Sequence, residues 1–208
     1  MHPPQDQLPR IFQANLHRFY VRVVEPGFAA LPEPARLEFG TTDCLDEFLS
    51  RTEARVDNHT RNEAGKAYTL ILSALFERQL RNWAGHLLPQ LPTARVQKGK
   101  LEDLLDDCIK AAGIDGARQD VRKDLIEAHA VANVVRHGDG DACTKLMTDA
   151  PHLWRYDRTD CVDINAGPSP DSEQLLIRSD DVTRYAQAGV RFWGRADPLP
   201  GSDEAGGF

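Results

Sequence analysis

The strongest constraint on the fold is a helical pattern of apolar residues that runs from Tyr68 to Leu87. Apolar side chains recur there at steps of three and four residues, which places them on one face of an α-helix. The members of this face are Tyr68, Ile71, Leu72, Leu75, Phe76, Leu80, Trp83 and Leu87. A face of this length must be covered by other elements, so the segment is predicted to be the central helix of a helical core. Pro89 is predicted to end it.

A second long apolar pattern extends from about Gly116 to His137, and Gly138 is predicted to stop it. Its apolar members are Val121, Leu125, Ile126, Ala128, Val131, Ala132, Val134 and Val135. Shorter helices are predicted over 8–24, 41–56, 101–113, 141–148 and 179–193, and the second of these has its apolar face at Leu45, Phe48, Leu49 and Val56.

Prolines, glycines and polar clusters mark the expected breaks between these helices. Pro26 and Gly27, with further prolines at 32 and 34, predict a connection that lasts until about Gly40. The polar run 57–62 predicts an interval before the central helix, and 89–99 is expected to be a loop. The apolar triplet at 175–177 is predicted to be a short strand or a clasp against the core.

The predicted architecture is therefore all-α, a compact helical bundle with at most a short strand or clasp near 175–178. A chain of 208 residues with 41% apolar content can bury one core. Residues 1–40 are expected to form an N-terminal helix and a proline-rich connection that pack on a helical domain spanning 41–195. Residues 196–208 are expected to be a disordered tail.

Charge and hydropathy limit the partners of the chain. The formal net charge is −7, so contact with a nucleic acid would need a local basic patch. No apolar run reaches the roughly 18 to 20 residues that cross a bilayer, and the first residues lack the charged and apolar parts of a signal peptide. The expected location is the cytoplasm, without membrane contact.

Four cysteines, Cys44, Cys108, Cys143 and Cys161, stand far apart in the sequence. Their spacing lacks the close pairs of a zinc site, so they are predicted to be small core residues. Motifs of nucleotide-binding loops, zinc proteases, nucleophile elbows and dinucleotide folds are absent from the sequence. Neither a metal nor a cofactor is expected.

Two segments in the strongest helices carry polar residues of interest, 76–86 and 131–140. The run Ala132-Asn-Val-Val-Arg-His-Gly-Asp-Gly140, followed by Lys145-Leu146 and Pro151-His-Leu-Trp154, resembles the signature N-x-x-K/R-H-G-x-G … L … P-x-L of helical bacterial proteins related to HEPN domains. The segments 76–81 and 181–193 are similar to the first and the closing core helix of these proteins. The resemblance covers about 68–193.

This resemblance implies a compact helical bundle that forms a homodimer. HEPN nucleases share an Arg followed, after four to six residues, by a His, and cleave RNA without a metal. In that chemistry the His assists attack by a ribose 2′-hydroxyl and the Arg stabilises the charge on the phosphate. The implied partners are a second copy of the chain, RNA, and a protein partner such as an antitoxin.

The candidate site residues from this resemblance are His137, Asn133 and Arg136 in the second segment, and Arg81 and His86 in the first. Arg81 and His86 are separated by four residues, which fits the nuclease motif. Arg10 with His17 and Arg122 with His129 also fit, so spacing alone selects no pair. Residues 130–132, where an Arg would precede His137, are Ala, Val and Ala. The cation would then come from Arg136, Arg122, Arg81 or a second subunit.

Structural explanations exist for the same residues. His137 at a helix C-terminus would interact with the negative end of the helix dipole, and Asn133 one turn earlier could orient its ring. Arg81 and His86 could form the polar edge of an amphipathic helix, with Glu77 and Arg81 as a surface pair.

Three functions therefore stay open. The first is an RNA-directed protein of bacterial defence or toxin type, which as an enzyme would be a metal-independent endoribonuclease. The second is a non-catalytic HEPN-like scaffold or partner-binding protein. The third is a helical sensor of a small molecule or nucleotide.

Overall fold

The computed structural model describes residues 2–38, 40–114, 119–157 and 171–202. All regular elements in these ranges are helical, which confirms the predicted all-α fold. The principal helices are α1 (Pro4–Phe19), α3 (Leu45–Leu87), α5 (Leu101–Ala112), α6 (Gln119–His137) and α8 (Ser179–Ala196). Shorter elements are α2 (Glu25–Ala29), α4 (Thr93–Lys98), α7 (Asp141–Asp149) and the single turns Tyr20–Val24, Pro151–Trp154 and Ser172–Gln174.

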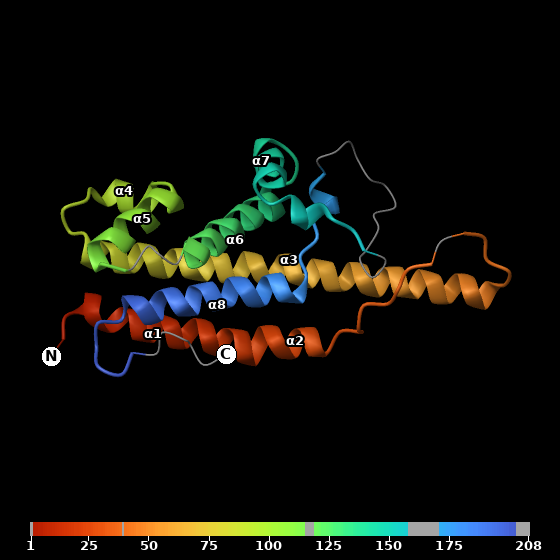
Figure 1. Cartoon of the computed structure of the whole chain (residues 1–208), viewed down its shortest axis with the longest axis horizontal. Helices are drawn as coiled ribbons and strands as arrows, with labels where there is room; N and C mark the ends of the chain where they lie inside the picture. Colours follow the sequence, from red (N-terminus) through yellow and green to blue (C-terminus); the bar gives the residue numbers. More distant parts are fainter. Residues whose placement is uncertain (1, 39, 115–118, 158–170, 203–208) are drawn as a thin grey trace.

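Helix α3 forms the axis of the bundle. Helices α1 and α8 lie along one side of it, and α5 and α6 lie along the other, with α7 on α6 (Figure 1). Among the described helices none is long and apolar enough to span a bilayer. The position of α3 between these two groups of helices confirms the predicted central role of the 68–87 segment.

An aromatic cluster fixes the packing of α1, α3 and α8. The ring centroids of Trp83 and Trp193 are 5.4 Å apart, and those of Phe12 and Trp193 are 5.1 Å apart, in edge-to-face contacts. Both indole N–H groups have acceptors, since Trp83 donates to the carbonyl of Gln5 at 2.9 Å and Trp193 to the side chain of Gln79 at 3.1 Å. Burial of the rings therefore leaves no indole donor of this cluster unpaired.

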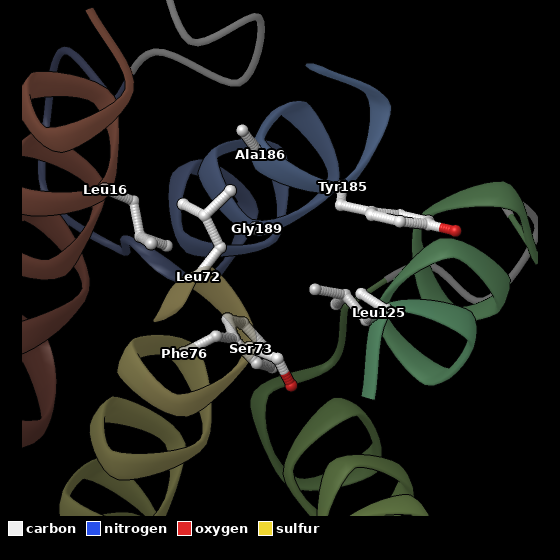
Figure 2. A pocket seen from close by; sticks show the side chains of 9 residues that line it. Leu16, Leu72, Ser73, Phe76, Leu125, Tyr185, Ala186 and Gly189 are labelled. Carbon is white, nitrogen blue, oxygen red and sulfur yellow. The ribbon is translucent and has the colours of Figure 1, made fainter. Parts of the chain in front are cut away.

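A small cavity lies where α1, α3, α6 and α8 meet (Figure 2). Its volume is about 20 Å³, and only Ser73 and Tyr185 bring polar side chains to a wall of apolar residues and Gly189. A space of this size holds at most one water molecule. This part of the bundle is thus closed to ligands, and a functional site must lie nearer the surface.

The predicted break at 57–62 is wrong, because α3 continues without interruption from Leu45 to Leu87. The polar residues of this run serve as clamps for extended chain. Asn58 accepts from the backbone N–H of Ala35 at 2.9 Å and donates to its carbonyl at 2.7 Å. Asn62 donates to the carbonyl of Leu175 at 3.0 Å and accepts from the N–H of Ile177 at 2.8 Å. The two asparagines of this run are therefore polar because they bond to backbone groups of other segments, not because the run is a loop.

The segment 175–177 is the predicted clasp, and it is extended rather than a strand. Besides its bonds to Asn62, it is held by a hydrogen bond from the N–H of Leu176 to the carbonyl of Leu153 at 2.9 Å, which joins the clasp to the turn Pro151–Trp154. The clasp crosses α3 at Gly65, where an added Cβ would lie 2.1 Å from the carbonyl oxygen of Ile177. Only glycine permits this close approach.

The predicted break at Pro26 and Gly27 is also wrong, because helical structure continues from α1 to Ala29. Tyr20–Val24 forms a π turn, and the N–H of Glu25 bonds to the carbonyl of Tyr20, five residues earlier. A proline cannot donate the usual bond and crowds the carbonyl four residues before it, and the wider π turn gives Pro26 the space that a regular α-helix would not.

Three further expectations need correction. The predicted loop 89–99 contains α4. The helix expected from about Thr41 begins at Leu45, and its apolar face at Leu45, Phe48, Leu49 and Val56 is exposed instead of packed. The start of the expected tail lies on the bundle, since the buried Asp197 accepts from Arg10 at 2.7 Å. Residues 203–208 of that tail lie outside the described residues.

The cysteines divide into two groups. Cys108 and Cys143 are buried, as predicted for core residues, whereas Cys44 is exposed and does not fit that prediction. Burial, together with the negative charge of Asp107, raises the pKa of Cys108 to about 12. Cys161 lies outside the described residues.

Candidate functional site

A groove between α5, α6 and α7 is the best candidate for a functional site. Its volume is about 250 Å³, more than ten times that of the cavity in the core. Five apolar side chains line it, namely those of Leu101, Ile126, Ala130, Ala142 and Leu146. The polar residues that line it are Lys100, Glu102, His129, Asn133, Lys145 and Asp149. A pocket with apolar walls and a few polar groups is the usual form of a ligand site.

One face of α6 supplies the residues that connect this groove with the sequence motif. Four residues share this face, because they follow one another along the helix at steps of four, three and one residues. They are His129, Asn133, Arg136 and His137. His129 and Asn133 line the groove and are half-buried, and Arg136 and His137 are exposed at the end of the helix. Gly138, with a φ of 74°, ends α6 directly after His137.

The surroundings of His129 shift its pKa. Burial lowers its pKa, an effect that the nearby carboxylate of Glu77 opposes and that the charges of Arg136 and Arg81 reinforce. The Nδ1 atom of His129 is 3.8 Å from Oε2 of Glu77, too far for a hydrogen bond. A histidine with a lowered pKa is neutral near pH 7 and can accept a proton.

Charges in the groove are mostly paired. Lys145 donates to Asp149 at 2.8 Å, and Glu102 accepts from Arg122 at 3.0 Å. Neither Lys100 nor the amide of Asn133 has a hydrogen-bond or ion-pair partner among the residues that the structure describes. Among the described residues, the lining of the groove thus holds one lysine and one amide that have no partner there.

Arg81 lies on α3 near His129 and bonds within the protein. Its guanidinium bonds to Glu77 at 2.7 Å, to the carbonyl of Val96 at 2.6 Å and to that of Gly99 at 2.9 Å. The predicted pair of Glu77 and Arg81 is therefore present, and it anchors the end of α4. These contacts engage Nε and both terminal nitrogens of Arg81, the donors that the nuclease motif would offer to a phosphate.

His86 is separated from the other candidates. It is exposed in the last turn of α3 and does not line the groove. Its position five places after Arg81 turns its side chain by roughly 140° around the helix at 3.6 residues per turn. The motif formed by Arg81 and His86 in the sequence thus forms no joint site within the described part of one chain.

The side chain of Asp139 holds the turn that follows α6. Asp139 accepts from the backbone N–H of Ser172 at 2.7 Å, and this bond lowers the pKa of Asp139. This contact holds Asp139 in the turn that follows α6. The bond joins the His-Gly end of α6 to the segment that continues into the clasp, which sets the position of His137 relative to the bundle.

A second group of charges lies between α6, α8 and the turn Pro151–Trp154. The buried carboxylate of Glu127 accepts from Tyr185 at 2.8 Å and from Arg184 at 2.5 Å, and His152 lies 3.4 Å away. Burial tends to raise the pKa of Glu127, but the bonds from Arg184 and Tyr185 outweigh it and leave the pKa below its usual value. Every member has a protein partner, so this cluster is a structural brace.

In the described ranges no three His, Cys, Asp or Glu side chains lie close enough together to hold a metal ion. Sequence reasoning missed the contribution of His129, Lys100 and Lys145. The spacing of His129 four residues before Asn133 was a usable signal, because it extends the motif by one turn along the same face. Nothing in the sequence indicated that α5 and α7 bring the two lysines to it.

Comparison with known proteins gave no match, whether to a protein-family model, to a curated sequence or to a solved structure.

Proposed function

We propose that this protein is a HEPN-like protein of bacterial defence or toxin type that acts on RNA through the groove and the adjoining end of α6. The observation that carries the proposal is the shared face of α6, which brings His129, Asn133, Arg136 and His137 to one surface next to a groove. The resemblance of residues 132–140 to the HEPN-related signature supports the same assignment.

In this proposal Arg136 and His137 form the reactive end of the site. Both are exposed, so a polymer can reach them, and the guanidinium of Arg136 can stabilise the charge of a phosphate. His137 would take the proton of a ribose 2′-hydroxyl as a general base, and the 2′-oxygen would then bond to the adjacent phosphorus. The bond from that phosphorus to the 5′-oxygen of the next nucleotide breaks, and the protonated His137 can return the proton to this leaving oxygen. Neither step requires a metal. Because the donors of Arg81 are bonded within the protein, Arg136 replaces Arg81 as the phosphate-binding residue.

The test is cleavage of a mixed pool of single-stranded RNA by the purified protein in EDTA. Wild type and His86→Ala should cut, since His86 lies outside the groove, whereas His137→Ala and Arg136→Gln should lose cutting by about a hundredfold or more, the usual effect of removing a general base or a charge-stabilising group. Loss of cutting in His86→Ala alone would contradict the assignment.

We infer that a second copy of the chain covers the exposed start of α3. The first turns of α3 extend beyond the other helices (Figure 1), and their side chains Leu45, Phe48, Leu49 and Val56 are 53–69% exposed. Asp46 and Glu53 flank this stripe on one side, and Arg55 flanks it on the other. Two parallel copies would place the acidic side of one helix against the basic side of the other.

A non-catalytic scaffold or partner-binding role is the second candidate. It is favoured by the bonding of Arg81 within the protein and by the exposed stripe on α3, to which a protein partner such as an antitoxin could bind. Under this alternative the RNA pool stays intact with every variant, while the stripe remains necessary for assembly.

A further inference from the structure

We propose that the groove between α5, α6 and α7 binds an extended, uncharged segment of another protein, with one apolar side chain of that segment seated between the three helices. The inference goes beyond the proposed action on RNA, whose reactive groups Arg136 and His137 lie at the end of α6, and the two ligands would exclude each other from the groove. At about 250 Å³ the groove is smaller than the roughly 300–1,000 Å³ of sites for drug-sized ligands, so it suits one or two side chains.

Two other asparagines of this chain show how such a segment would be held. The side-chain amide of Asn58 accepts from the N–H of Ala35 at 2.9 Å and donates to its carbonyl at 2.7 Å. The amide of Asn62 donates to the carbonyl of Leu175 at 3.0 Å and accepts from the N–H of Ile177 at 2.8 Å. In both cases one helical asparagine uses its donor and its acceptor to fix the backbone of an extended segment.

Asn133 presents the same amide to the groove. It is half-buried on α6, lines the groove, and has no hydrogen-bond partner among the residues that the structure describes. Its donor and acceptor can bond at once to a carbonyl and an N–H of a bound backbone, as those of Asn58 and Asn62 do. Main-chain bonds of this kind supply affinity for an extended segment, and a pocket for its side chain supplies selectivity.

The spacing of Asn133 and His129 also matches an extended backbone. The two residues are four apart, roughly 6 Å along α6. Backbone groups on the same side of an extended segment recur every second residue, at about 6.6 Å. Burial lowers the pKa of His129, so its ring is neutral near pH 7 and carries one donor and one acceptor. A segment that runs along α6 would therefore meet both side chains with successive groups of its backbone.

The walls of the groove accept an apolar side chain. Leu101 comes from α5, Ile126 and Ala130 come from α6, and Ala142 and Leu146 come from α7. An apolar side chain that enters between these three helices leaves water, which is the main source of binding free energy for such a group. A charged side chain would lose its hydration against the same walls.

The charges at the groove cancel. The charged side chains that line it are two lysines and two acids, namely Lys100, Lys145, Glu102 and Asp149. Beside them Arg122 donates to Glu102 at 3.0 Å and to Asp106 at 2.6 Å, which adds one charge of each sign. The sum over these side chains is zero, so an uncharged segment is complementary to the groove.

The experiment titrates the full chain with capped pentapeptides in which one central residue is flanked by serine and glycine, and follows the chemical shifts of backbone amides. Peptides with a central leucine or phenylalanine should shift amides of α5, α6 and α7 in a saturable way. Peptides with a central aspartate or lysine should bind about tenfold more weakly or worse, because a charge would enter the apolar walls. Asn133→Ala should weaken the apolar peptides by about tenfold, the order of one or two lost hydrogen bonds.

Methylation of the backbone nitrogens of the peptide separates a direct bond from a structural role of Asn133. It should weaken binding to wild type and have a smaller effect on Asn133→Ala, which has already lost the partner of one N–H. Ala142→Trp, which places a bulky ring in the groove from an exposed position on α7, should remove binding. Asn15→Ala, which removes an exposed amide on α1, is the matched control and should bind like wild type.

The absence of a saturable shift with both apolar peptides would overturn the inference. Equal binding of the leucine and aspartate peptides, or unchanged binding by either Asn133→Ala or Ala142→Trp in folded protein, would overturn it as well. Peptide binding at the groove without any cutting of RNA would refute the proposed function and leave the inference in place.

Discussion

Gly65 and Gly85 lie on the same helix, α3, in opposite surroundings. A Cβ at Gly65 would collide with the backbone of Ile177, whereas a Cβ at Gly85 would meet nothing within 4 Å. We expect Gly65→Ala to lower the free energy of unfolding by about 3 kcal/mol through overpacking. Gly85→Ala should raise it by roughly 0.5–1 kcal/mol, because alanine is the better helix former. Urea unfolding of both variants measures the difference, and equal effects would contradict the close approach of the clasp.

The pH dependence of stability should report the burial of His129. In the unfolded chain this histidine gains a proton near its ordinary pKa of 6.5, whereas in the folded protein its lowered pKa delays protonation. The unfolded state then binds more protons, so the free energy of unfolding should fall as the pH drops below 6.5. This loss of stability should end once the pH is below the pKa that His129 has in the folded protein.

Urea unfolding of His129→Asn between about pH 7.5 and about pH 5, a range around the ordinary pKa, should show a smaller loss than wild type. Gly85→Ala, which changes stability without touching a titratable group, is the control and should keep the slope of wild type. A slope that is equal in all three proteins would mean that His129 is not held neutral by the fold.

Individual site residues were predictable only in part. Asn133, Arg136 and His137 followed from the motif, and the structure places them on one face of α6 with His129. The fate of Arg81 could not be predicted, because its partners are the carbonyls of Val96 and Gly99, in a segment without a pattern of its own. Every residue carries the same backbone carbonyl, so the sequence does not show which carbonyl will accept a hydrogen bond.

The clasp at 175–177 depends on one side chain of α3. Replacing Asn62 by Ala leaves the carbonyl of Leu175 and the N–H of Ile177 without their partner in a buried place. We expect a loss of about 2 kcal/mol in the free energy of unfolding, the typical cost of unpaired buried groups. Hydrogen exchange at Ile177 should become faster.

Asn58→Ala is the control for this effect, since Asn58 holds the backbone of Ala35 in the same manner. It should loosen the segment around Ala35 and leave exchange at Ile177 as in wild type. Faster exchange at Ile177 in both variants would show that the two clamps act as one unit and not separately.

Helices were predicted well where an apolar face was covered by neighbours, as in α6 and the second half of α3. The same method failed at 57–62. The asparagines there bond to extended backbone and are not exposed to solvent, but in the sequence a polar run of this kind is typical of a loop. It failed at Pro26 because proline normally breaks a helix, and a π turn that accommodates it has no clear sequence signal.

The assembly of the whole protein should depend on the start of α3. We expect wild type to sediment as a dimer at micromolar concentration, and a variant with Phe48→Glu and Leu49→Glu to sediment as a monomer, since each change places a charge in the apolar stripe. Ile11→Glu, an exposed apolar position on α1, is the control and should remain dimeric. A monomeric wild type, or dissociation only by Ile11→Glu, would contradict the proposed interface.

The overall all-α bundle followed from helical periodicity, but the long-range arrangement that creates the groove did not. The groove exists because α5 and α7 lie beside α6, and their order in the sequence does not determine that distance. An acidic chain also hides a local site of this kind, because a single lysine such as Lys100 adds only one unit to a formal net charge of −7.

The most direct test of RNA recognition at this surface is ultraviolet cross-linking of the full chain to uniform single-stranded RNA, followed by mass spectrometry of the peptides. The account predicts adducts in peptides from α6, α7 and the start of α5, and their loss in Ala142→Trp. Adducts confined to the first turns of α3, or none above the level of the denatured protein, would contradict it.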